Sequence, residues 1–135
     1  MAFALNRIGQ IAFSVADVER AEAFYRDALG LRHLYRYGDL TFFDCAGVRL
    51  LLEKSSDPNN VSRGSPLYFV CHDMALAVAE LTQRGVSFDG PPHLIARMPD
   101  HDLWMAFFSD PDGHTLALMQ EAPKGYAPPP TAQTR

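Results

Sequence analysis

The fold is decided by the stretch Gly9-Gln10-Ile11-Ala12-Phe13-Ser14-Val15-Ala16-Asp17. Every second residue from Ile11 to Val15 is apolar, which predicts a strand with one buried face and one smaller, more polar face. Asp17 follows directly, and its carboxylate can accept hydrogen bonds from the first turn of a helix. The stretch therefore predicts a strand that runs straight into a capped helix over residues 18–29.

Gly30 is predicted to end this helix, because glycine readily adopts the left-handed conformation that follows a last helical turn. Glu22 and Arg26 lie four residues apart and are predicted to pair on the outer face of the helix. Three further strands are predicted over residues 31–37, 40–45 and 48–53. A polar loop over 55–65 follows them.

The pattern then restarts at Pro66. A second strand leads into a helix capped by Asp73 and ended by Gly85, and shorter strands are predicted over 86–88, 93–98, 103–108 and 115–119. Three features correspond between the halves: Asp17 with Asp73, Gly30 with Gly85, and Gly47-x-x-Leu50-x-Leu52 with Gly113-x-x-Leu116-x-Leu118. Such a repeat predicts an α+β protein made of two βαβββ modules, which together form a curved, open barrel of mixed sheets.

The length of 135 residues suits one domain, predicted over 1–121 with modules at about 7–54 and 66–121. Residues 122–135 are rich in proline and are expected to be disordered or to lie on a partner. The net charge of −4 gives no reason to expect nucleic acid or a membrane as a partner. Cys45 and Cys71 are interpreted as free thiols in a cytoplasmic protein, with a disulfide between them as the alternative.

Two motifs resemble the vicinal oxygen chelate superfamily of glyoxalases, bleomycin-resistance proteins and extradiol dioxygenases. They are Ile11-x-Phe13-x-Val15-x-Asp17-Val18-x-x-Ala21-x-x-Phe24-Tyr25-x-x-x-Leu29-Gly30-Leu31 and Phe108-x-Asp110-Pro111-Asp112-Gly113-x-x-Leu116-x-Leu118. The resemblance covers residues 7–121 and implies the two-module barrel. It also implies a homodimer and, in metal-dependent members, one divalent ion inside the barrel.

The resemblance places the four metal-ligand positions of the superfamily on Gln10, Leu51, Pro66 and Ala117. A glutamine amide oxygen can bind a hard ion, whereas leucine, proline and alanine side chains offer no donor atom. The usual metal site of the superfamily is therefore not predicted here.

Relocated ligands are the alternative. Glu53 lies on the strand face of Leu51, Glu121 lies on that of Ala117, and His93 follows two prolines. These three residues, with Gln10, are the candidate metal ligands. Each also has a simpler interpretation, since Glu53 ends a strand, Glu121 begins the tail and His93 can be an ordinary loop residue.

The polar face of the first strand is expected to line a mostly apolar cavity for a small organic molecule. The residues expected to bind that molecule are Gln10, Ser14, Arg49, Glu53, Tyr68, His93 and Trp104. Arg49 is expected to pair either with a ligand carboxylate or with Glu53. His33, Tyr35 and Tyr37 are predicted to share one strand face, and His114 is predicted to be exposed.

These observations favour a protein that binds a small molecule without a metal. A metal-dependent lyase, isomerase or dioxygenase with relocated ligands is the alternative. A third possibility is a protein that acts mainly through association, by its dimer and its proline-rich tail. No nucleophile signature is present, so no catalytic residue is assigned and enzyme activity stays open.

Overall fold

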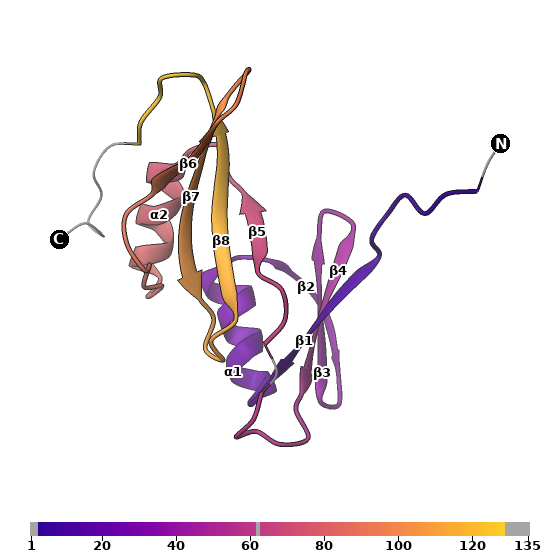
Figure 1. The fold of residues 1–135 in the computed structure, drawn as a ribbon. Helices are drawn as coiled ribbons and strands as arrows, with labels where there is room; N and C mark the ends of the chain where they lie inside the picture. The colour runs from indigo at the N-terminus through magenta and orange to yellow at the C-terminus, as the bar shows by residue number, and fades with distance from the viewer. Residues whose placement is uncertain (1–2, 62, 129–135) are drawn as a thin grey trace. The chain divides into compact units, whose positions relative to one another are not determined.

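A computed structural model describes residues 3–61 and 63–128. The chain divides between Arg63 and Gly64 into two compact units, each with a four-stranded sheet and a helix (Figure 1). This confirms the predicted α+β class and the two βαβββ modules. No helix of the described residues is long and apolar enough to cross a bilayer.

The first unit has the strand order β1-β4-β3-β2, with β1 parallel to β4 and the other pairs antiparallel. Its helix packs on β3 and β4. Its elements are β1 (Gln10–Val15), α1 (Val18–Ala23), a π-helical turn η1 (Phe24–Ala28), β2 (Arg32–Tyr37), β3 (Leu40–Cys45) and β4 (Val48–Lys54).

The second unit repeats this arrangement with the order β5-β8-β7-β6, in which β5 is parallel to β8. Its helix packs on β8. Its elements are β5 (Leu67–Val70), α2 (Met74–Gln83), β6 (His93–Arg97), β7 (Asp102–Ser109) and β8 (Thr115–Ala122). The short strand predicted over 86–88 is reduced to one isolated bridge between Phe88 and Phe108.

The helix caps form as the sequence predicts. Asp17 Oδ1 accepts a hydrogen bond from the backbone N–H of Arg20, and Asp73 Oδ1 accepts one from that of Leu76, both at 3.1 Å. Gly30 follows the first helix with φ 76°, a conformation that a side chain would strain. Phe13 and Val15 are buried, so the apolar face of β1 is the one in the core, as its alternation predicts.

A β-bulge in β2 changes which residues share a face. His33 pairs in register with Phe43 and Tyr35 with Phe42, so Leu34 is an extra residue between them. The His33 ring packs on Phe43, which is buried, whereas Tyr35 packs on Phe42. The prediction that His33 and Tyr35 lie on one face is therefore wrong, because the extra residue reverses the alternation.

Residues beyond β8 remain attached to the second unit as far as they are described. Lys124 Nζ donates to Met98 O at 2.7 Å and to Asp102 Oδ1 at 3.0 Å, and the N–H of Gly125 donates to Asp102 Oδ2 at 2.9 Å. The Asp102 side chain is buried, and these hydrogen bonds lower the pKa of its carboxyl group, the one from Gly125 most. Of the predicted disordered tail, residues 129–135 lie outside the described residues.

Replacing Asp102 with asparagine is expected to speed trypsin cleavage after Lys124 by about tenfold, because the variant loses the charged acceptor that holds this lysine. Asp100→Asn is the matched control, since Asp100 lies two residues before Asp102, in the turn that precedes β7, and its carboxylate is exposed. Cleavage is followed by mass spectrometry, with circular dichroism to confirm folding. Equal cleavage of the two variants would contradict the anchoring role.

Candidate ligand-binding site

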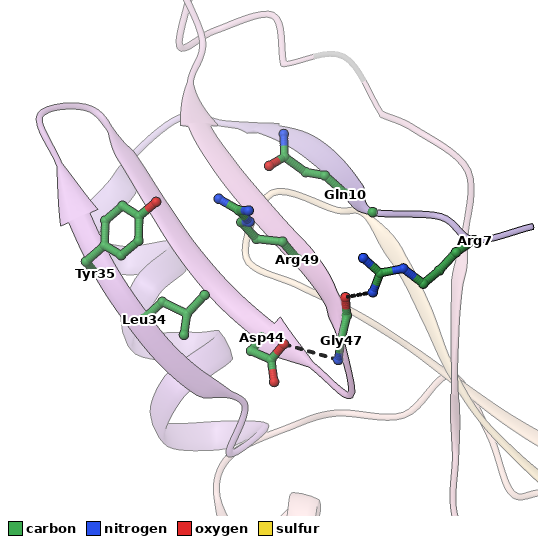
Figure 2. Close-up of a pocket in the computed structure, with 8 residues that line it drawn as sticks. Arg7, Gln10, Leu34, Tyr35, Asp44, Gly47 and Arg49 are labelled. Carbon is green, nitrogen blue, oxygen red and sulfur yellow. Dashed lines mark hydrogen bonds between the residues drawn. The ribbon is translucent and has the colours of Figure 1, made fainter. Parts of the chain in front are cut away.

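The first unit carries a cavity of about 560 Å³ at the beginning of β1 and β4 (Figure 2). All the residues that line it come from this unit. They are Arg7, Gly9, Gln10, Leu34, Tyr35, Asp44, Gly47 and Arg49. The cavity mixes charged, polar and aromatic side chains, which suits recognition of a small polar molecule.

Parallel strand pairing places Gln10 beside Arg49. The two residues are partners in the β1–β4 register, and the Arg49 N–H donates to Gly9 O at 2.9 Å. Both side chains are exposed, on the face opposite buried Phe13. Two residues that the sequence analysis selected separately thus line one cavity.

Aromatic contacts hold the Arg49 side chain. Its guanidinium carbon lies 5.9 Å from the centre of the Phe42 ring, and the Tyr35 ring packs against the same ring at 4.7 Å between centroids. A guanidinium over an aromatic face is favoured electrostatically and keeps its N–H edges available for other partners.

Arg7 approaches the cavity from the segment before β1. Its Nη1 donates to Gly47 O at 3.3 Å. Asp44 Oδ1 accepts from the N–H of Gly47 at 3.1 Å, and Asp44 Oδ2 lies 3.7 Å from Arg32 Nη1. The one carboxylate of the cavity is therefore engaged by Gly47 and Arg32 rather than by Arg7 or Arg49.

Ser14 and Glu53 lie elsewhere on the same sheet. They are register partners of each other, four residues along the strands from Gln10 and Arg49, which corresponds to about 13 Å. Neither lines the cavity. In the part of the chain that the structure describes, Arg49 and Glu53 form no ion pair.

In the second unit, Tyr68 and His93 meet at Phe107. The His93 ring stacks on Phe107 at 5.9 Å between centroids, and the Tyr68 ring meets Phe107 in a T-shaped arrangement at 6.4 Å. Trp104 is on the other face of β7, the face of buried Ala106 and Phe108. The structure thus separates Trp104 from the other two predicted ligand contacts of this unit.

The two candidate metal ligands of the first unit are far apart, because Gln10 and Glu53 lie at opposite ends of β1 and β4. Over residues 3–61 and 63–128, no three His, Cys, Asp or Glu side chains gather in a way that could hold an ion. Glu121 lies inside β8 rather than at the start of a tail, with its carboxylate 3.9 Å from His101 Nε2.

The four superfamily positions do not supply a donor set either. Leu51 is a half-buried hydrocarbon side chain, Ala117 is fully buried and pairs with Tyr68, and Pro66 precedes β5. The residues present therefore do not fit the ion that the resemblance implies. Cys45 and Cys71 are free thiols, and burial is the main cause of the raised pKa of each, so neither is an activated nucleophile.

A buried ion cluster, which no local sequence pattern predicts, lies on the helix side of the first sheet. Glu22 is 7% exposed and accepts hydrogen bonds from Arg36 Nη2 at 3.0 Å and Thr41 Oγ1 at 2.7 Å. His33 Nε2 lies 3.1 Å from Glu22 Oε1. The hydrogen bond from Arg36 is the main reason that the pKa of Glu22 falls from 4.5 to about 2, against the opposing effect of burial.

This cluster corrects one prediction. Arg26 does pair with Glu22 at 3.3 Å, but Glu22 is not on the outer face of the helix. The β2 bulge explains the arrangement, because His33 and Arg36 are three residues apart and a regular strand would direct them to opposite faces. His114 was likewise expected to be exposed and is 1% exposed, and its backbone N–H donates to Asp110 Oδ1 at 2.9 Å.

Several cavity residues were not selected from the sequence. Asp44 could have been found, because the predicted turn at Ala46-Gly47 pairs Asp44 with Arg49 across the β3–β4 hairpin. Arg7 could not have been found in this way, because it precedes β1 and no periodic pattern predicts the direction of its side chain.

Comparison with known proteins adds two findings. Residues 7–118 match the family model described as Glyoxalase/Bleomycin resistance protein/Dioxygenase superfamily. The metallothiol transferase FosB of Lysinibacillus sphaericus strain C3-41 is 29% identical over 120 residues, which cover 82% of this chain and 79% of that protein.

Solved structures of similar fold include two with nearly complete overlap. An integron cassette protein, VCH_CASS1, from the mobile metagenome of V. cholerae superposes with a TM-score of 0.74 at 18% identity, covering 90% of this chain and 100% of that one. A lactoylglutathione lyase from Agrobacterium tumefaciens gives a TM-score of 0.67 at 24% identity, with 87% and 95% covered. These likenesses concern the fold alone.

Proposed function

This chain belongs to the glyoxalase/bleomycin resistance protein/dioxygenase superfamily, and on that premise we propose that it binds a small organic molecule in the cavity of the first unit. The observation that carries the proposal is the placement of Gln10 and Arg49 side by side on the wall of that cavity. A cavity of this size is typical of a small-molecule site, although its lining is more polar and charged than the mostly apolar one that the sequence predicts.

We further propose that binding uses no metal ion at the superfamily's usual position. The support is the chemistry of the side chains there, since Leu51, Pro66 and Ala117 have no donor atom. A metal-dependent transferase, lyase, isomerase or dioxygenase is the second candidate. The observation in its favour is the similarity to a protein named metallothiol transferase.

Metal analysis of protein purified without chelator separates these candidates. The expected result is far less than one Ni, Zn, Mn or Fe ion per chain and no rise in melting temperature when these ions are added, because tight binding to the native state raises that temperature. One ion per chain, lost in Gln10→Ala, would contradict the first candidate. Native mass spectrometry of the same sample is expected to show an organic molecule bound.

We also propose an oligomeric state and a cellular location. A homodimer is proposed from the superfamily resemblance, and light scattering of the purified protein tests it. A cytoplasmic location is proposed because both cysteines are free thiols. A truncation after Glu121 that changed the oligomeric state would favour the rival idea of an association protein.

A further inference from the structure

We infer that the molecule bound in the cavity of the first unit carries an oxyanion, a carboxylate or a phosphate-type group, and that Arg49 and Arg7 bind this group. The inference rests on the proposed function and specifies its ligand class. Arginine suits this role because its planar set of N–H donors matches two oxygens of such a group at once.

Positive charge exceeds negative charge among the residues that line the cavity. Arg7 and Arg49 both line the cavity, and among residues 3–61 and 63–128 neither has a carboxylate partner at ion-pair distance. The cavity's own carboxylate, Asp44, faces Arg32 and the Gly47 N–H instead. The positive charge of the two guanidinium groups is therefore only partly balanced inside the cavity, which favours an anionic ligand.

The Arg49 side chain is preorganised for a ligand. Stacking on Phe42 restrains Arg49, so less side-chain freedom is lost when a ligand binds. In Figure 2 its guanidinium group lies between the hydroxyl of Tyr35 and the amide of Gln10. Both groups line the same cavity and can donate further hydrogen bonds to an oxyanion.

The internal repeat places other residues at the positions of Gln10 and Arg49 in the second module. Gln10 corresponds to Pro66 in the second module, and Arg49 corresponds to Thr115. The second module builds the same parallel strand pair without either residue. The fold therefore does not require a cation at this position, and the arginine is available for a ligand.

Titrations of the full chain followed by amide NMR test the inference. The probes are benzoate, phenylphosphonate and inorganic phosphate, with neutral benzamide as the matched control, at up to about 10 mM because affinities near millimolar are expected for such fragments. The anionic probes are expected to shift the signals of Gly9, Gln10 and Gly47. Benzoate is expected to bind at least about tenfold tighter than benzamide. Comparison of benzoate with phenylphosphonate shows which oxyanion the site prefers.

Arg49→Gln is expected to weaken binding of the preferred anion by about tenfold, whereas Arg84→Gln, the same charge change on an exposed helix end, should leave it unchanged. Equal binding of benzoate and benzamide, unaffected by Arg49→Gln, would overturn the inference and leave small-molecule binding intact. The inference would also be overturned if no anion shifted the amide NMR signals of the cavity residues. In that case, native mass spectrometry of the purified protein still tests independently whether any organic molecule is bound.

Discussion

Replacing Phe43 with alanine is expected to lower the free energy of unfolding by about 3–5 kcal/mol, the largest single effect we anticipate in this chain. The Phe43 side chain is fully buried on the helix side of β3. Its ring lies 6.1 Å from that of Tyr25 and 5.1 Å from that of His33, between centroids. Alanine would leave a cavity between the sheet and the helix that these rings cannot fill. Urea denaturation followed by circular dichroism measures the loss.

The neighbouring residue provides the control. Phe42→Ala removes the same atoms from the opposite face of the same strand, where the ring is only half-buried. Its cost should be no more than about half that of Phe43→Ala. Because Phe42 packs on Tyr35 and Arg49, its loss should instead weaken binding in the cavity. Equal destabilisation by the two variants would show that the helix side is not the main core of this unit.

Replacing Glu22 with glutamine is expected to lower the free energy of unfolding by about 2 kcal/mol at neutral pH. The change removes the charge that Arg36 Nη2 meets at 3.0 Å, while glutamine keeps the size of the side chain. The cost is less than that of breaking a fully enclosed pair, because the Arg36 side chain is 34% exposed and can regain water. Glu19→Gln, with an 82% exposed carboxylate 3.7 Å from the same arginine, is the matched control.

The same variant has a defined pH signature. The pKa of Glu22 falls from 4.5 to about 2 on folding, so its contribution is complete above the unfolded value and is lost as the pH falls toward the folded one. The stability difference between the wild type and Glu22→Gln should therefore shrink between pH 4.5 and about 2. A difference that stayed constant with pH would mean that the carboxylate charge of Glu22 does not stabilise the fold.

The fold could be predicted largely because its signals are local. Alternation in β1, the caps at Asp17 and Asp73, and the repeated glycines each depend on residues close in sequence. The ion cluster depends on distant partners, since Arg36 and Thr41 follow Glu22 by 14 and 19 residues. The i,i+4 spacing of a helix pairs Glu22 with Arg26 alone, and that pairing predicts an exposed position for Glu22.

The candidate site was predictable to a similar extent. Gln10 and Arg49 follow from the repeat and from strand alternation, which fix their face and their neighbourhood. Tyr35 was assigned to the face of His33 because no residue pattern in β2 reveals an extra residue. The strand face of Trp104 could not be predicted either, because a tryptophan side chain has both apolar and polar parts and can occupy either face of a strand.

Because Leu34 is an extra residue in β2, the number of residues in this strand decides which side chains lie on each face of the sheet. On one side of the bulge the strand supplies His33 to the Glu22 cluster, and on the other it supplies Tyr35 to the cavity. Insertion or loss of one residue here would direct His33 and Arg36 to opposite faces of the sheet, and would therefore alter stability and ligand binding together. Related sequences should therefore tolerate substitutions in this strand more readily than gaps, and an alignment that places a gap inside it would compare residues from opposite sides of the sheet.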